Sequence, residues 1–160
     1  MVLRPVLFER LSAAAPGTVT LVCAPAGSGK TVLLRSWAAQ IEEAVAWVTV
    51  ERGERDSQRF CLHVIDALAD AAGDDMIERV SPAPGFAGPV VVERLLAQLE
   101  RLEEPVQMVI DDLHELHSGD ALTWLETLLA RLPAQVRVVL ATREEPQVAH
   151  CPVSTGGSPI

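Results

Sequence analysis

The chain has 160 residues, of which 49% are hydrophobic, and a formal net charge of −9 at pH 7. This composition excludes general disorder and suits one domain with a sizeable core. An acidic chain without a basic stretch is not expected to bind nucleic acid directly, because such binding needs clustered Lys and Arg.

Membrane association and secretion are also excluded by the sequence. No segment has the length of a membrane span, and the N-terminal residues lack the apolar core of a signal peptide. The three cysteines are widely spaced, which is typical of reduced thiols, with Cys23 and Cys61 buried as small apolar residues. We therefore expect a cytoplasmic protein with no membrane partner.

The first predicted elements are a short helix over residues 8–15 and a β-strand over residues 19–23, which is an apolar, β-branched run. The next residues, 24–31, read Ala-Pro-Ala-Gly-Ser-Gly-Lys-Thr, and Val32, Leu33, Trp37 and Ile41 then follow at near-helical spacing. The sequence between strand and helix therefore predicts a phosphate-binding loop.

Each residue type in this loop has a chemical reason. Glycines allow backbone conformations in which successive N–H groups point at phosphate oxygens, and the helix that follows adds its positive dipole end. Lys30 is the only lysine of the chain and can reach the β- and γ-phosphates, while the Thr31 hydroxyl is a Mg²⁺ ligand. The expected nucleotide-binding residues are Ala26, Gly27, Ser28, Gly29, Lys30 and Thr31.

Three more strands, over residues 45–50, 106–110 and 136–141, alternate with predicted helices. Ser57 and Asp120 are expected to cap two of these helices, and Pro89 suits the start of a third, after a loop over residues 73–88. Alternating strands and helices predict an α/β fold with a parallel sheet. We expect one domain over residues 1–146 and a disordered tail over residues 147–160, where Pro and Gly leave nothing that could pack.

The strand over residues 106–110 ends at Asp111 and Asp112. Downstream of a phosphate-binding loop, this pattern favours Asp111 as a Mg²⁺ ligand and Asp112 as the group that orients or deprotonates an attacking water. The alternative is that two aspartates simply end a strand in a solvated turn. Aspartate is one methylene shorter than glutamate, so any ATP hydrolysis is expected to be weak.

Polar side chains also follow the third and fourth strands. Arg143 lies where a γ-phosphate would be sensed, since ligands in open α/β sheets bind at the carboxyl ends of the strands. Its alternative is a surface arginine paired with Glu144 or Glu145. His114 and His117 favour a supporting or structural role over a transition-metal site, because no third soft ligand is near in sequence.

These elements, in this order, resemble the large LuxR-type transcriptional regulators, the maltose-regulator group of the STAND signalling NTPases. The similar motifs are Arg-Pro-x-Leu-x-x-Arg-Leu at 4–11, the loop at 24–31 with Leu-Leu-x-x-Trp-Ala at 33–38, Val-Ala-Trp-Val at 45–48, Asp-Ser-Gln-Arg-Phe at 56–60, Ile-Asp-Asp-Leu-His at 110–114 and Ala-Thr-Arg-Glu-Glu-Pro at 141–146. The resemblance implies a three-layer P-loop NTPase sandwich with sheet order 1-4-3-2. It also implies ATP or ADP with Mg²⁺ as cofactors and nucleotide-dependent self-assembly.

The chain departs from this family after residue 146, because no fifth strand, helical repeats or DNA-binding domain can follow there. We therefore expect a C-terminally truncated ATP-binding switch module that associates with itself or with a full-length homologue. Two alternatives remain open at this point. One is a small P-loop phosphotransferase, whose only candidate lid holds one arginine, Arg79. The other is a remnant that binds no nucleotide and acts only through a full-length relative.

Overall fold

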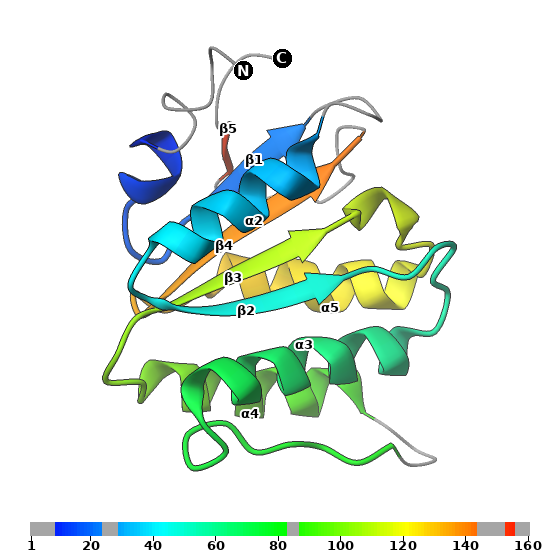
Figure 1. Ribbon diagram of the computed structural model, residues 1–160. Coiled ribbons are helices and arrows are strands. Elements are labelled where there is room, and N and C mark those ends of the chain that lie inside the picture. The colour runs from blue at the N-terminus through cyan, green and yellow to red at the C-terminus, as the bar shows by residue number, and fades with distance from the viewer. Residues whose placement is uncertain (1–8, 24–28, 83–86, 144–152, 156–160) are drawn as a thin grey trace.

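The computed structural model describes residues 9–23, 29–82, 87–143 and the backbone of 153–155 (Figure 1). Residues 9–12 form one helical turn, within the short helix predicted over residues 8–15. The named elements that follow are β1 (Val19–Cys23), α2 (Lys30–Gln40), β2 (Ala44–Thr49), α3 (Ser57–Ala72), α4 (Gly88–Glu100), β3 (Val106–Asp111), η1 (Leu113–Glu115), α5 (Gly119–Ala130), β4 (Val136–Thr142) and β5 (Val153–Thr155). No helix in the described part of the chain is long and apolar enough to span a membrane.

The strands form one parallel sheet of order β2-β3-β4-β1-β5. The predicted order 1-4-3-2 is confirmed. The prediction that no fifth strand follows is wrong, because β5 pairs in parallel with Val19–Leu21 of β1. An unpaired strand edge leaves backbone N–H and C=O groups without partners, and even a three-residue Val-Ser-Thr segment between prolines and glycines can pair with them.

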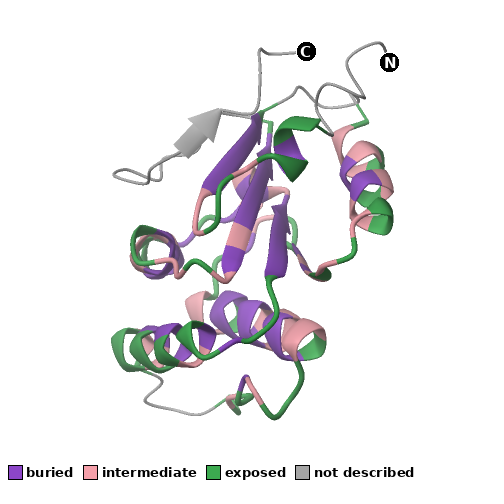
Figure 2. Ribbon diagram, turned by 90° about the vertical axis from the view of Figure 1, so that its left-hand side faces the viewer, coloured by how far each residue is buried: buried purple, intermediate pink, exposed green. Residues whose placement is uncertain are grey.

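Helices cover both faces of the sheet, which gives the predicted three-layer sandwich (Figure 1). Successive side chains of a strand point to opposite faces, so β3 supplies Met108 and Ile110 to the core beneath α3, α4 and α5 and Val109 to the core beneath α2. Strands β1, β3 and β4 are buried over most of their length (Figure 2). All six residues of β3 are buried, because this strand lies between β2 and β4 and is covered on both faces.

Two helix caps differ from the prediction. Asp56, not Ser57, caps α3, and its carboxylate accepts from the backbone N–H of Arg59 at 3.1 Å. Ser118, not Asp120, caps α5, and its hydroxyl accepts from the N–H of Ala121 at 3.2 Å. Each cap lies three residues before the N–H that it satisfies. The expected apolar face of α2 is also narrower than predicted, since Val32 is 66% exposed while Leu34 and Trp37 are buried.

Arg137 of β4 joins the sheet to the N-terminal turn. Its guanidinium donates to the carbonyl oxygens of Ser12 and Ala14 at 3.3 and 3.2 Å and to Glu43 at 2.5 Å. With the amide of Gln107 turned so that its oxygen faces the arginine, that oxygen accepts from Nη2 and Nε at 2.9 and 2.8 Å. Gln107 is 1% exposed, so this arginine satisfies a polar group that water does not reach.

Replacing Arg137 with alanine is therefore expected to lower the free energy of unfolding by about 2–5 kcal/mol, because it leaves Glu43 and Gln107 without partners. Denaturant unfolding followed by circular dichroism measures this loss. The double variant Arg137→Met, Gln107→Leu also removes the buried amide, so it is expected to recover the part of the loss that comes from Gln107, while Glu43 stays without its partner. A single alanine variant as stable as the parent would show that the network contributes nothing.

The two described cysteines differ in exposure. Cys61 is buried as predicted, whereas Cys23, at the end of β1, is exposed, contrary to the prediction. Strand β1 is buried only up to Val22, so its last residue faces solvent. Burial raises the pKa of the Cys61 thiol to about 12, which leaves almost no reactive thiolate at neutral pH.

We therefore expect one fast-reacting thiol in the folded Cys151→Ser variant when it is treated with a disulfide reagent at pH 8. That thiol is Cys23, and the control variant Cys23→Ser should show no fast reaction. Cys61 should react only on unfolding. Folding raises the pKa of the Cys61 thiol above its ordinary value of 9.0. The buried neutral thiol therefore contributes to the free energy of unfolding when the pH is below that pKa, and this contribution is lost as the pH rises above it. Rapid reaction of Cys61 in the native state would contradict this burial.

Candidate nucleotide-binding site

The predicted phosphate-binding loop lies in the sequence between the carboxyl end of β1 and the amino end of α2. Ala26, Gly27 and Ser28 lie outside the described residues, so the structure places only Gly29, Lys30 and Thr31 of the predicted set. Gly29 caps α2 with a φ of 80°, a conformation that side chains with a Cβ rarely adopt, and its carbonyl accepts from the N–H of Leu33 at 2.9 Å. The helix therefore begins with its N–H groups directed back toward the loop.

Thr31 and Asp111 meet although 80 residues separate them in sequence. The Thr31 hydroxyl donates to Oδ2 of Asp111 at 2.8 Å. Asp111 is 1% exposed and ends β3, while Thr31 lies in the first turn of α2. The structure thus brings together a hydroxyl and a carboxylate, the two hard oxygen ligands that the sequence predicts for Mg²⁺.

This pair fits Mg²⁺ in the way that nucleotide sites usually bind it. No group of three or more His, Cys, Asp or Glu among the described residues could hold a metal by itself. Mg²⁺ typically takes one or two protein oxygens and completes its shell with water and phosphate. A site with one hydroxyl and one buried carboxylate therefore suits a Mg²⁺–nucleotide complex rather than a resident ion.

Asp112 lies next to the lysine of the loop. Its Oδ1 is 3.5 Å from the Lys30 ammonium, and its N–H donates to Oδ1 of Asp111 at 2.9 Å. Its backbone has a φ of 58°, the left-handed region in which Asp and Asn are among the few tolerated residues. This turn separates the two carboxylates: Asp111 is buried, whereas the Asp112 side chain is 37% exposed. The simple strand-end alternative does not account for the contacts of both aspartates with the start of α2.

Arg143 follows β4 and lies against the segment after β3. Its Nε is 2.9 Å from Nε2 of His114, and its backbone N is 3.2 Å from Nδ1 of the same ring. A neutral imidazole accepts at one nitrogen only, and we assign that hydrogen bond to the shorter, charge-assisted contact with the guanidinium. Both nitrogens of the His114 ring therefore lie within hydrogen-bond distance of Arg143, and Nε2 is also 3.6 Å from the carboxylate of Glu115.

Glu115 is a residue of this site that sequence reasoning did not identify. One carboxylate oxygen is 3.7 Å from Arg143 Nη2, and the other accepts from the N–H of Gly53 at 3.1 Å. Arg143 thus has an ion-pair partner in Glu115, while Glu144 and Glu145, its predicted alternatives, lie outside the described residues. Glu115 follows His114 directly in the sequence, which could have suggested that it belongs to the site. The sequence does not show that the short helix η1 turns both side chains toward β4.

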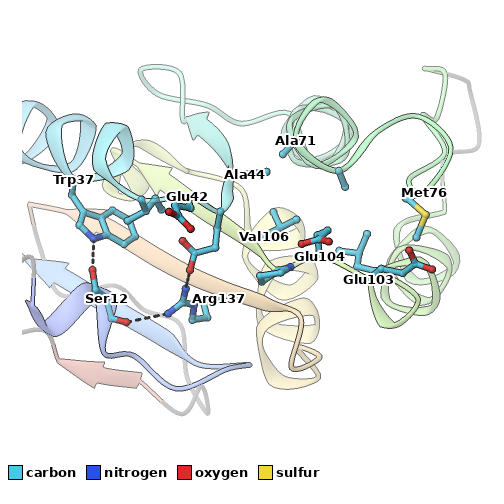
Figure 3. Close-up of a pocket in the computed structure, with 15 residues that line it drawn as sticks. Ser12, Trp37, Glu42, Ala44, Ala71, Met76, Glu103, Glu104, Val106 and Arg137 are labelled. Carbon is cyan, nitrogen blue, oxygen red and sulfur yellow. Dashed lines mark hydrogen bonds and ion pairs between the residues drawn. The ribbon is translucent and has the colours of Figure 1, made fainter.

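A cavity of about 810 Å³ lies at the amino ends of β2 and β3 (Figure 3). Arg137, Glu43 and Trp37 line it, and no predicted nucleotide-binding residue does. Ligands in open α/β sheets bind outside the carboxyl ends of the strands, where Lys30, Thr31, Asp111, Asp112 and Arg143 lie. The predicted nucleotide-binding residues that the structure describes therefore lie at the carboxyl edge of the sheet and not in this cavity.

Three features together define a P-loop NTPase fold. They are a parallel sheet in which β2, β3, β4 and β1 are neighbours in that order, a helix that starts at Lys30 and Thr31, and a carboxylate at the end of β3. The comparison with known families gives the same class. Residues 6–140 match the AAA ATPase domain, and the chain belongs to this family.

The sequence is also similar to the HTH-type transcriptional regulator MalT of Yersinia pestis (strain Pestoides F), with 28% identity over 150 residues. This match covers 92% of the chain and 16% of the relative, so the chain spans about a sixth of the length of that regulator. The predicted resemblance to the N-terminal NTPase domain of maltose-regulator-like proteins is confirmed.

Two structures support the fold. One is a STAND protein with a tetratricopeptide repeat sensor from Pyrococcus horikoshii, with a TM-score of 0.61 and 20% identity over 95% of this chain and 22% of that one. The other is a Drosophila ORC structure, bound to GC-rich DNA and Cdc6, with a TM-score of 0.62 and 13% identity over 99% of this chain and 55% of that one. At these identities the likeness supports the fold alone.

Proposed function

We propose that this domain binds Mg-ATP and Mg-ADP as the switch module of a LuxR-type transcriptional regulator and hydrolyses ATP slowly or not at all. The observation that carries the proposal is the 2.8 Å hydrogen bond between Thr31 and Asp111, which joins the start of the loop helix to the end of the carboxylate strand. Both groups offer oxygen atoms of the kind that bind Mg²⁺, and Asp112, which follows Asp111, is 3.5 Å from the Lys30 ammonium.

The residues have separate roles in this proposal. Lys30 and the loop backbone from Ala26 to Gly29 hold the phosphates, and Thr31 and Asp111 hold Mg²⁺, which neutralises phosphate charge when it is bound. Asp112 orients the attacking water and Arg143 reads the γ-phosphate. Because Asp112 pairs with Lys30, nucleotide phosphates must compete with this carboxylate for the ammonium.

The contacts of Arg143 favour a switch over a fast enzyme. In the described structure its guanidinium is held by His114 and Glu115, and Glu115 also bonds the N–H of Gly53 in the segment after β2. A γ-phosphate that attracts Arg143 would have to compete with these contacts. Nucleotide state would then change how the Gly53 segment is held, which is a route from the nucleotide to the surface of the domain.

The structure also argues against the phosphotransferase alternative. Arg79, the one arginine of its candidate lid, is 3.5, 2.5 and 2.9 Å from carboxylate oxygens of Asp66, Asp70 and Asp74. These carboxylates already compensate the charge of Arg79, and the bonds to Asp70 and Asp74 raise its pKa. We propose that the domain acts in the cytoplasm through self-association or a full-length homologue and does not bind nucleic acid directly.

Calorimetric titration of the folded chain with Mg-ATP and Mg-ADP tests the proposal. Saturable binding that weakens when EDTA removes the metal is expected, because Thr31 and Asp111 would lose the ion that joins them to the phosphates. The matched control is Thr31→Val, which keeps the shape of the side chain, removes the hydroxyl and should lose the EDTA effect. A folded chain, checked by circular dichroism, that binds neither nucleotide would refute the function proposed here.

A further inference from the structure

Glu115 is an acidic residue that binds neither phosphate nor Mg²⁺ in the function proposed above. Its Oε1 atom accepts from the N–H of Gly53 at 3.1 Å, and its Oε2 atom lies 3.7 Å from Nη2 of Arg143 and 3.6 Å from Nε2 of His114. Within the described part of the chain, it is the carboxylate that comes within ion-pair distance of Arg143. Glu115 is therefore the counter-ion of the arginine that we propose to read the γ-phosphate.

The backbone fixes the position of this carboxylate. Two residues after Glu115, the N–H of His117 donates to the carbonyl oxygen of Glu54 at 2.6 Å, next to the bond that Gly53 makes to the Glu115 side chain. The segment after β2 and the segment after β3 are thus joined at two neighbouring points. The Glu115 side chain is 20% exposed, whereas that of Arg143 is 45% exposed. In a rearrangement of the pair, the guanidinium is the group that moves.

The ion pair affects the two nucleotides differently. A γ-phosphate that draws Arg143 toward itself must take the guanidinium away from Glu115, and the lost ion pair reduces the free energy gained on binding ATP. ADP has no γ-phosphate and leaves the pair intact. The other partner of the Arg143 side chain, His114, accepts as a neutral ring, so the competition between charges lies with Glu115.

We propose that Glu115 is a specificity-determining residue that lowers the preference of the site for ATP over ADP by holding Arg143. This inference rests on the proposed function, in which Arg143 reads the γ-phosphate, and it adds how that reading is regulated. Glu115 acts through Arg143 and is a positioning residue. With ATP bound, its carboxylate loses Arg143 and keeps its bond to Gly53, so the ion pair reports which nucleotide occupies the site.

Glu115→Gln tests the proposal, because it keeps the length of the side chain and an oxygen that can accept from Gly53, and removes the charge that holds Arg143. Calorimetric titration of the folded chain is expected to show Mg-ATP binding roughly two- to fivefold tighter than in the parent, the range for a partly exposed ion pair. Mg-ADP binding should be unchanged. The matched control is Glu103→Gln, which removes the same charge from an exposed residue at the amino edge of the sheet and should change neither affinity.

A double-mutant cycle separates this role from a general change in charge or stability. In Arg143→Met, which removes the guanidinium and keeps an apolar side chain, adding Glu115→Gln should no longer change the ratio of the ATP and ADP affinities. An equal gain in ATP affinity with and without Arg143 would mean that Glu115 repels the nucleotide directly, and would overturn the proposal. Equal effects of Glu115→Gln on ATP and ADP, or an effect on neither, would also overturn it.

A second measurement needs no variant. In ¹⁵N–¹H spectra of the parent, saturating Mg-ATP should move the Gly53 amide signal, because its acceptor loses Arg143, and Mg-ADP should leave it in place. A signal that responds alike to both nucleotides contradicts the inference but not the proposed function. A folded parent that binds neither nucleotide refutes the proposed function and this inference with it.

Discussion

Replacing Lys30 with alanine is expected to weaken Mg-ATP and Mg-ADP binding by roughly 10- to 150-fold, since a charge-assisted contact to phosphate contributes about 1.5–3 kcal/mol. The Lys30 side chain is only 10% exposed, at the first position of α2, where its ammonium lies 3.5 Å from Asp112. It is also the only lysine of the chain. No neighbouring lysine can therefore replace its charge at the loop.

Calorimetry of parent and variant under the same conditions measures this loss. The matched control is Arg131→Ala, which also removes one positive charge, but from an exposed side chain at the end of α5 that pairs with Glu93. This control should bind nucleotide as the parent does. Equal affinity in the Lys30 variant and the parent would show that the loop does not hold phosphates, whatever the thermal stability of the two proteins.

The sheet could be predicted because its signals are local and strong. Val19–Cys23, Val106–Asp111 and Val136–Thr142 are apolar, β-branched runs whose predicted bounds hold to within one residue. The order of the strands came from the family resemblance, since periodicity alone does not say which strands are neighbours. The short strand β5 was missed because prolines and glycines surround three residues that pair only when an open strand edge is nearby.

The site was predictable at the level of residue identity but not of contact. A loop lysine and a strand-end aspartate predict a shared site, and the contact between Thr31 and Asp111 agrees with this. Three details of the site depend on how η1 lies against β4 and the segment after β2. They are the left-handed turn at Asp112, the bond from Arg143 to His114 and the bond from Gly53 to Glu115. Such contacts join segments far apart in sequence, and no single segment carries a signal for them.

The helix caps show the same limit on a smaller scale. Asp56 and Ser57 both suit a cap, as do Ser118 and Asp120, and propensity does not separate neighbours of the same class. The choice depends on which side chain can turn back to the third N–H of the helix. In both helices it is the earlier residue, because the later one already has helical backbone geometry.

Asparagine at Asp112 is expected to leave nucleotide affinity nearly unchanged and to lower the rate of ATP hydrolysis by roughly 10²–10⁴-fold, the usual contribution of a general base. Asparagine tolerates the left-handed backbone, whereas alanine at a φ of 58° would add strain and confuse the result. The change removes the carboxylate that faces Lys30, so phosphate binding should be equal or slightly tighter. Phosphate release under single-turnover conditions, together with calorimetry, measures both effects.

Asp112→Glu keeps the charge and extends the carboxylate by one methylene, but glutamate lacks the tolerance of Asp and Asn for a φ of 58°, so its unfolding is compared with that of the parent before its hydrolysis is interpreted. If Asp112 orients the attacking water, this variant retains hydrolysis, because the longer side chain still presents an acceptor at the strand end. Hydrolysis by the asparagine variant at the rate of the parent would remove Asp112 from the reaction. Its 3.5 Å contact with Lys30 would then be explained as a contact that holds the lysine in place while no nucleotide is bound.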